Sequence, residues 1–193
     1  MHEIHHTEGF ILHTSDAGEA NTLFHIFTKD LGRITATAQS LRREQSKLRG
    51  HLALYAHVAL DVVQGRAVWR IIAARSLDDL PFSLPLPVRR LYGRTLEVLN
   101  RLCQGEEPHE ALFVHVAEFT ALIRERALSV VERKFLDTIS VVRMLSALGY
   151  LEQDAAVHIA TSGTLAEALA RIDEASNKIL IERAHEAFKA SHL

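Results

Sequence analysis

Four cations lie close together between residues 40 and 50, in the stretch SLRREQSKLRG. Glu44 is the only acid there, and Ser40, Gln45 and Ser46 add hydrogen-bond donors. Because Lys and Arg neutralise phosphate groups, a loop of this composition suits a polyanion. Spacing alone favours the plainer interpretation of a solvated loop, since charge runs usually just face water. The candidate phosphate-binding residues are Arg42, Arg43, Lys47 and Arg49.

Three short apolar runs lead into this basic stretch and are typical of β-strands. They cover residues 9–14, 21–28 and 33–38, and in the third run apolar and polar residues alternate. Arg33 begins the third run. It is a fifth candidate, either on the outer face beside the basic stretch or in a surface salt bridge.

Two longer runs follow, over residues 51–63 and 66–74. Gln64-Gly65 between them predicts a tight hairpin turn. Five strands joined by short turns suit a closed barrel.

Three of the four prolines fall in LPFSLPLP, residues 80–87, which predicts an extended boundary segment. Beyond it the apolar period becomes helical, and Ser129 with Glu132 and Thr164 with Glu167 have capping-box spacing. The predicted fold class is α+β, with a five-stranded barrel over residues 1–80 and an all-helical domain over 81–193. Expected helices cover about 88–103, 109–126, 129–149 and 175–190, with another start near Thr164.

The ordered set GFILHT, Glu19, LFHIFTKDLGRITATAQ and RREQSKLRG resembles the RecO family of recombination mediators. The helical half extends the resemblance through QGEEPHEALFVHVAEF and FLDTISVVRMLSALGYL. The resemblance implies an N-terminal OB-fold that binds nucleic acid, followed by a helical domain. Together with the preceding strands it favours DNA contact over a plain solvated loop for the basic-stretch residues Arg42, Arg43, Lys47 and Arg49. It also implies a mediator of DNA repair that binds single- and double-stranded DNA and assists annealing or recombinase loading. Its expected partners are RecR and the C-terminal tail of the single-stranded-DNA-binding protein.

One feature departs from the family pattern. Many family members carry a four-cysteine zinc module soon after the Leu-Gly-Tyr element, where this chain has LEQDAAVHIATSG. Cys103 is the only cysteine of the chain, so a cysteine zinc site cannot form within it. We therefore expect no metal and no other cofactor.

By family analogy, the acidic tail of the single-stranded-DNA-binding protein should enter an apolar groove rimmed by cations in the helical half. The alternative is that the bundle core uses all of these apolar faces. Four arginines are available for the rim, and their spacing does not choose among them: Arg124, Arg126, Arg133 and Arg143.

Stacking of bases on aromatic rings is the second requirement for single-strand binding, worth about 1 to 3 kcal/mol per base. Five aromatic residues lie in predicted strands, where core packing is the favoured role: Phe10, Phe24, Phe27, Tyr55 and Trp69. Tyr55 and Trp69 are the candidates for exposed rings, because their polar atoms prefer a wet edge.

The chain contains twelve histidines, which gain charge as the pH falls through about 6.5, so a pH-sensitive affinity would follow. A third hypothesis for the function is a metal-dependent enzyme on a small barrel, and the number of histidines is its only support. His2, His5 and His6, and His51 with His57, lack recognised ligand spacing. No nucleophile–base set or phosphate-binding glycine loop occurs either, so we expect a binding protein and not an enzyme.

The formal net charge of −2 argues against general attraction to DNA, so any binding must be local. This charge and the missing zinc module favour an alternative, an interaction adaptor that keeps the fold but has lost DNA binding. The longest apolar runs fall short of the roughly 20 residues that cross a membrane. With its single cysteine, the chain is expected to be cytoplasmic and to have no membrane partner.

Overall fold

The computed structural model describes residues 3–17, 21–38, 48 and 50–191. The chain forms two compact units, which we call the barrel unit and the helical unit. The barrel unit consists of Met1–Leu84 with Cys103–Glu110, and the helical unit consists of Pro85–Leu102 with Ala111–Leu193. The barrel unit therefore includes a segment that follows the first helix, which a boundary after residue 80 leaves out.

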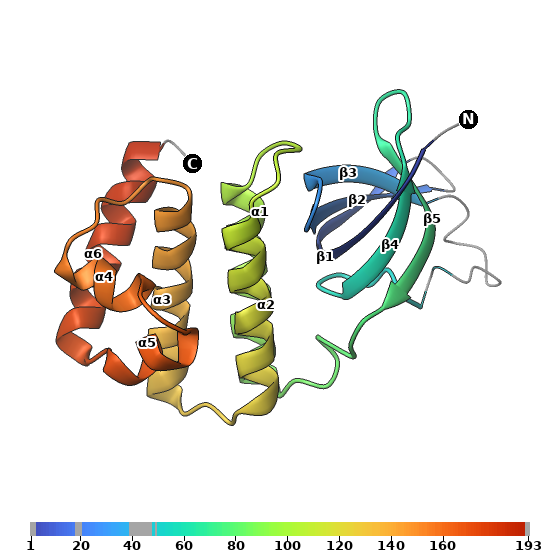
Figure 1. Ribbon diagram of the computed structural model, residues 1–193. Helices are drawn as coiled ribbons and strands as arrows, with labels where there is room; N and C mark the ends of the chain where they lie inside the picture. The colour runs from blue at the N-terminus through green and yellow to red at the C-terminus, as the bar shows by residue number, and fades with distance from the viewer. Residues whose placement is uncertain (1–2, 18–20, 39–47, 49, 192–193) are drawn as a thin grey trace. The chain divides into compact units, whose positions relative to one another are not determined.

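Five strands close into a barrel in the order β1-β2-β3-β5-β4 (Figure 1). Neighbouring strands are antiparallel except β3 and β5, which pair in parallel. This barrel, followed by helices, confirms the expected α+β fold class. The strands are β1 (Ile4–Ala17), β2 (Asn21–Thr28), β3 (Gly32–Ala38), β4 (His57–Val63) and β5 (Trp69–Ser76).

The pairing of β1 with β4 closes the barrel. The first half of β1 lies against β4, from Ile4 opposite Val63 onward, and its second half lies against β2. A bulge between Ile11 and His13 interrupts the register with β2. β1 begins at Ile4, ahead of the predicted start at residue 9. Its first residues are mostly polar and so show no apolar run in the sequence, but they pair with β4.

Two local predictions were wrong. Residues 51–56 form turns instead of the first half of a strand, and Tyr55 there has a φ of 66°. The N–H of Tyr55 donates to the carbonyl of Ile11 at 2.9 Å, outside any strand ladder. The connection between β4 and β5 covers residues 64–68, so it is longer than the predicted two-residue turn.

Residues that alternate along the strands fill the barrel. Phe24, Ile26, Ile34 and Ala36 are fully buried, as expected for the inward set of β2 and β3. The same core includes Ile11, Leu52, Ala56, Val58, Leu60, Val62, Trp69 and Ile71.

The segment 103–110 packs against the barrel. The N–H of Arg33 donates to the carbonyl of Gly105 at 3.0 Å, and Trp69 Nε1 donates to Glu106 Oε1 at 3.0 Å. Gly32 has a φ of 67°, and a Cβ there would lie 2.4 Å from the carbonyl oxygen of Glu107. Only glycine therefore fits at this contact.

In the helical unit, α3 packs against α1, α4, α5 and α6. Both predicted capping boxes are present: Ser129 and Glu132 begin α3, and Thr164 and Glu167 begin α5. The prediction missed α4, which is only seven residues long. The helices are α1 (Leu86–Leu102), α2 (Glu110–Glu125), α3 (Val130–Ala147), α4 (Ala155–Thr161), α5 (Leu165–Arg171) and α6 (Glu174–Ser191). Among the residues that the structure describes, no helix is long and apolar enough to cross a membrane.

Candidate nucleic-acid interface

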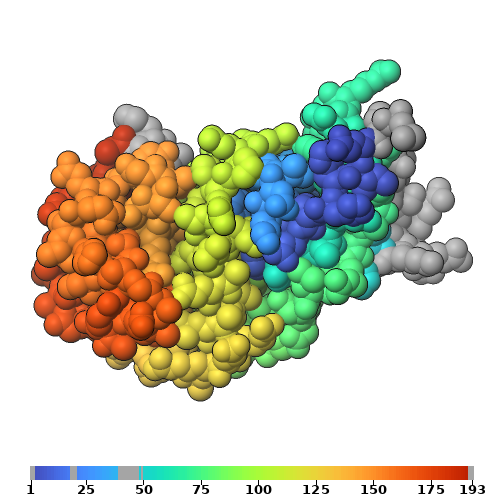
Figure 2. Space-filling view, viewed as in Figure 1, coloured from blue at the N-terminus to red at the C-terminus, as the bar shows by residue number. Residues whose placement is uncertain are grey.

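The outer face of β1, β2 and β3 carries polar side chains in register. His13 lies opposite His25, which lies opposite Thr35, so these three residues form one row across the strands. In the next row Leu23 lies opposite Thr37. These positions alternate with the buried core residues and are at least partly exposed. In the space-filling view the blue residues of β1 to β3 form part of the visible surface of the barrel unit (Figure 2).

Arg33 lies at the start of β3, and its side chain has partners within the barrel unit. Its Nη2 lies 2.7 Å from His25 Nδ1, and its Nη1 donates to Gln104 Oε1 at 3.3 Å. Burial lowers the pKa of its guanidinium, an effect that Cys103 opposes. Arg33 lies near the start of β3, whereas the basic stretch follows in the chain after Ala38, the last residue of that strand.

Arg70 lies beside the end of β3 that leads into the basic stretch. Its Cα pairs with that of Thr37, one residue before the end of β3. The side chain of Arg70 is exposed, whereas the preceding Trp69 is buried in the core. Arg66 is exposed in the 64–68 connection. Sequence analysis missed both arginines because neither belongs to a charge run, and only the pairing of β3 with β5 brings Arg70 to this edge.

The basic stretch itself is the strongest candidate from sequence. Arg42, Arg43, Lys47 and Arg49 all lie outside the described residues. Their phosphate-binding role stays a prediction.

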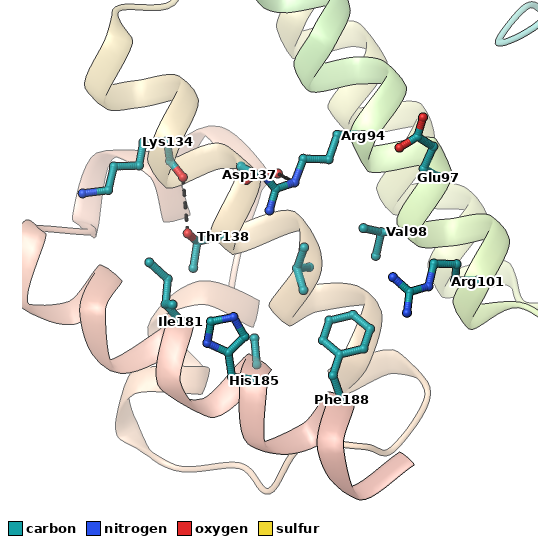
Figure 3. Close-up of a pocket in the computed structure, with 12 residues that line it drawn as sticks. Arg94, Glu97, Val98, Arg101, Lys134, Asp137, Thr138, Ile181, His185 and Phe188 are labelled. Carbon is teal, nitrogen blue, oxygen red and sulfur yellow. Dashed lines mark hydrogen bonds and ion pairs between the residues drawn. The ribbon is translucent and has the colours of Figure 1, made fainter. Parts of the chain in front are cut away.

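A groove of about 680 Å³ lies between α1, α3 and α6 of the helical unit (Figure 3). Val98, Ile181 and Phe188 supply apolar surface. Arg94, Arg101 and Lys134 supply cations, against the carboxylates of Glu97 and Asp137. With three cations and two carboxylates, the lining of the groove has a formal net charge of +1.

The charges of the groove are already partly paired. Arg94 Nε lies 3.3 Å from Asp137 Oδ1, and Lys134 forms an ion pair with Glu174. Burial raises the pKa of the Asp137 carboxyl, and Arg94 opposes that rise. An acidic ligand in the groove would therefore compete with Asp137 for Arg94.

Residues 1–78 match the family described as "Recombination protein O N terminal", a range that contains all five strands of the barrel. Residues 1–78 thus carry the N-terminal domain of the RecO family.

Proteins named DNA repair protein RecO are similar to this chain over most of its length. The one from Roseiflexus sp. (strain RS-1) is 29% identical over 153 residues, which cover 78% of this chain and 52% of the relative. The one from Aromatoleum aromaticum is 29% identical over 148 residues, covering 73% of this chain and 56% of the relative. A shorter match, to the protein from Dehalococcoides mccartyi (strain 195), is 31% identical over 110 residues, which cover 55% of this chain and 43% of the relative. The chain thus spans about half the length of the curated RecO relatives it matches.

The arginines considered for a tail site do not line the groove. Arg143 donates to three backbone carbonyls and pairs with Glu118, while Arg133 donates to the carbonyl of Leu128. Arg126 forms an ion pair with Glu132, and Arg124 is exposed in the last turn of α2. The groove instead brings together Arg94, Arg101 and Lys134, which sequence reasoning did not select.

The aromatic residues of the barrel mostly pack in the core. Trp69 is 6% exposed and its Nε1 donates to Glu106, so it has the favoured packing role and is not an exposed ring for stacking. Tyr55 is half-buried in the turn before β4. Phe10, Phe24 and Phe27 are fully buried, which confirms their predicted role in packing.

The histidines singled out in the sequence have separate local partners. His6 Nδ1 lies 2.6 Å from Asp61 Oδ1, and His5 packs edge-on against Trp69. His51 Nδ1 lies 3.1 Å from Ser76 Oγ, and His57 Nδ1 lies 3.3 Å from Asp78 Oδ2. Within the described ranges no three His, Cys, Asp or Glu residues cluster as a metal site would require. His2 lies outside those ranges.

Cys103 and His115 are buried groups without an evident reactive role. Burial raises the pKa of the Cys103 thiol to about 12, although nearby Arg33 opposes the rise. A thiol with this pKa is a poor nucleophile at neutral pH. Burial also lowers the pKa of His115 to about 3, with a smaller contribution from Arg143.

Proposed function

We propose that this protein is a DNA-binding recombination mediator in DNA repair, which binds single- and double-stranded DNA and promotes annealing and recombinase loading. The observation that carries the proposal is the coincidence of the family match over residues 1–78 with a closed OB-type barrel. The names of the similar proteins support the repair role. We propose that it acts by binding and not by catalysis.

OB-folds bind oligonucleotides on the face of strands 2 and 3 and on the adjoining loops. In this chain that face carries the row His13, His25 and Thr35, with Arg70 at the edge beside Thr37. We place the DNA backbone along this face, with the basic stretch after Ala38 contributing phosphate contacts. Contacts to phosphate carry no sequence information, so binding should be independent of sequence.

The groove between α1, α3 and α6 is our proposed site for the tail of the single-stranded-DNA-binding protein. An acidic peptide with an apolar end suits this lining, because apolar burial supplies affinity while Arg101 and Arg94 hold carboxylates. The match of residues 1–78 to the RecO family supports RecR as a proposed second partner. Co-elution of the purified proteins tests RecR directly.

A salt titration of oligonucleotide binding tests the DNA-binding proposal. Binding of single-stranded and duplex oligonucleotides should weaken linearly in log K against log salt, as counterion release requires. Absence of binding at low salt would favour the alternative, an interaction adaptor with the same fold, for which the net charge of −2 is the supporting observation.

A further inference from the structure

Three side chains that can carry positive charge meet on the outer face of β1–β3. The rings of His13 and His25 have centroids 5.4 Å apart and are tilted by 42°. Arg33 Nη2 lies 2.7 Å from His25 Nδ1. A cluster of this kind needs a negative partner if more than one of its members is charged.

The contact with Arg33 identifies which nitrogen of His25 carries the proton. A guanidinium has donors only, so the Nδ1 that faces it must be the unprotonated acceptor. Neutral His25 therefore carries its proton on Nε2. A second proton could bind only at Nδ1, where it would replace the hydrogen bond from Arg33 and release Nη2.

The groups that face His25 from each neighbouring element offer no carboxylate. β1 supplies His13, β3 supplies Arg33 and the neutral Thr35, and the 103–110 segment reaches Arg33 through Gln104. Asp16 is the acid nearest to His13 along β1 and lies opposite Thr22, beyond this row. Burial, Arg33 and His13 all lower the pKa of His25.

We propose that His13 and His25 form a proton-linked contact for a backbone phosphate of single-stranded DNA. A phosphate seated between the two rings would accept from the protonated imidazoles and from the released Nη2 of Arg33. Binding of the phosphate and protonation of the histidines then favour each other. The phosphate offsets the repulsion among the positive charges, and the protons supply the positive charge that attracts the phosphate. The inference rests on the proposed DNA-binding function and adds to it a dependence on pH.

The test is oligothymidylate binding by fluorescence anisotropy at pH 6.0 and pH 7.5, at constant ionic strength, on the full chain. Wild type should bind about tenfold more tightly at pH 6.0, within the range usual for coupled sites. In the double variant His13→Gln, His25→Gln the affinities at pH 6.0 and pH 7.5 should be nearly equal. His13→Lys, whose charge does not depend on pH in this range, should bind at pH 7.5 more tightly than wild type.

His158→Gln is the matched control, because His158 is an exposed histidine of the helical unit. It should keep the wild-type ratio of the affinity at pH 6.0 to the affinity at pH 7.5. Binding with the same ratio in wild type and in the double variant would overturn the inference while leaving the proposed function standing. No binding at either pH would overturn both, and circular dichroism melts of each variant show that the fold is retained.

Discussion

Arg143 and Glu118 form a largely buried ion pair that holds the connection between α4 and α5. Arg143 Nη1 lies 3.3 Å from Glu118 Oε2, and 11% of the arginine side chain is exposed. Arg143 also donates to the carbonyls of Ala160, Gly163 and Thr164, while Glu118 accepts from the N–H of Leu165. This pair thus ties α2 and α3 to the segment that joins α4 and α5.

Arg143→Met should destabilise the helical unit by about 2 to 3 kcal/mol, because it leaves Glu118 and three carbonyls without their donor. Urea unfolding measures the change. Arg124→Met is the control and should stay within about 0.5 kcal/mol of wild type, since Arg124 is exposed. Equal stability of the two variants would show that the pair contributes nothing.

His115 should make the protein less stable in mild acid. Its pKa of about 3 in the folded chain lies below the ordinary 6.5, so below pH 6.5 the unfolded chain binds a proton that the folded chain does not. Stability is therefore lost as the pH falls from 6.5 toward 3, by up to about 1.4 kcal/mol per pH unit. His115→Leu should flatten this slope between pH 6.5 and pH 4.5 in urea unfolding. An unchanged slope would contradict the assignment.

The double change Arg42→Glu, Arg43→Glu should weaken binding to all oligonucleotides alike. Each lost phosphate contact should reduce the slope of log K against log salt by about 0.7 for single strands. Arg89→Glu, Arg90→Glu is the matched control, because these adjacent arginines are exposed on α1 and the charge change is the same. If both double variants lose affinity equally, net charge and not the basic stretch controls binding.

Arg70→Glu should weaken single-strand binding about tenfold at low salt, because Arg70 lies beside the end of β3 that leads into the basic stretch. Arg75→Glu carries the same charge change on an exposed residue of the same strand, opposite Ala59 of β4. It should bind nearly as wild type in the same anisotropy assay. The reverse order of the two variants would place the DNA on another face of the barrel.

Arg101→Glu should weaken binding of an acidic peptide that ends in apolar residues by about tenfold or more, because Arg101 lines the groove of α1, α3 and α6. Arg124→Glu, at the end of α2 and outside the lining, should not. Isothermal titration with the tail peptide gives both affinities. Chemical-shift changes confined to the barrel unit would remove the site from the helices.

Local patterns in the sequence were sufficient for much of the fold. An apolar run over residues 21–28 and alternation along residues 33–38 predicted two strands of the barrel, and two capping boxes predicted the starts of α3 and α5. These features depend on residues within a few positions of one another, so the sequence contains their whole cause. The turns at 51–56 were missed because their apolar residues continue the run of β4. The helix α4 was missed because seven residues are too few to show a helical period.

The sequence alone determined the fold class, the family resemblance and the presence of a basic stretch after the third strand. Only the tertiary structure decided that Trp69 is buried, that Arg70 lies beside Thr37, and that His13, His25 and Arg33 meet. Each of these facts depends on strand register or on the return of the 103–110 segment to the barrel. A shift of one residue in pairing turns every side chain to the opposite face, so such contacts are set by the closed barrel and not by local pattern.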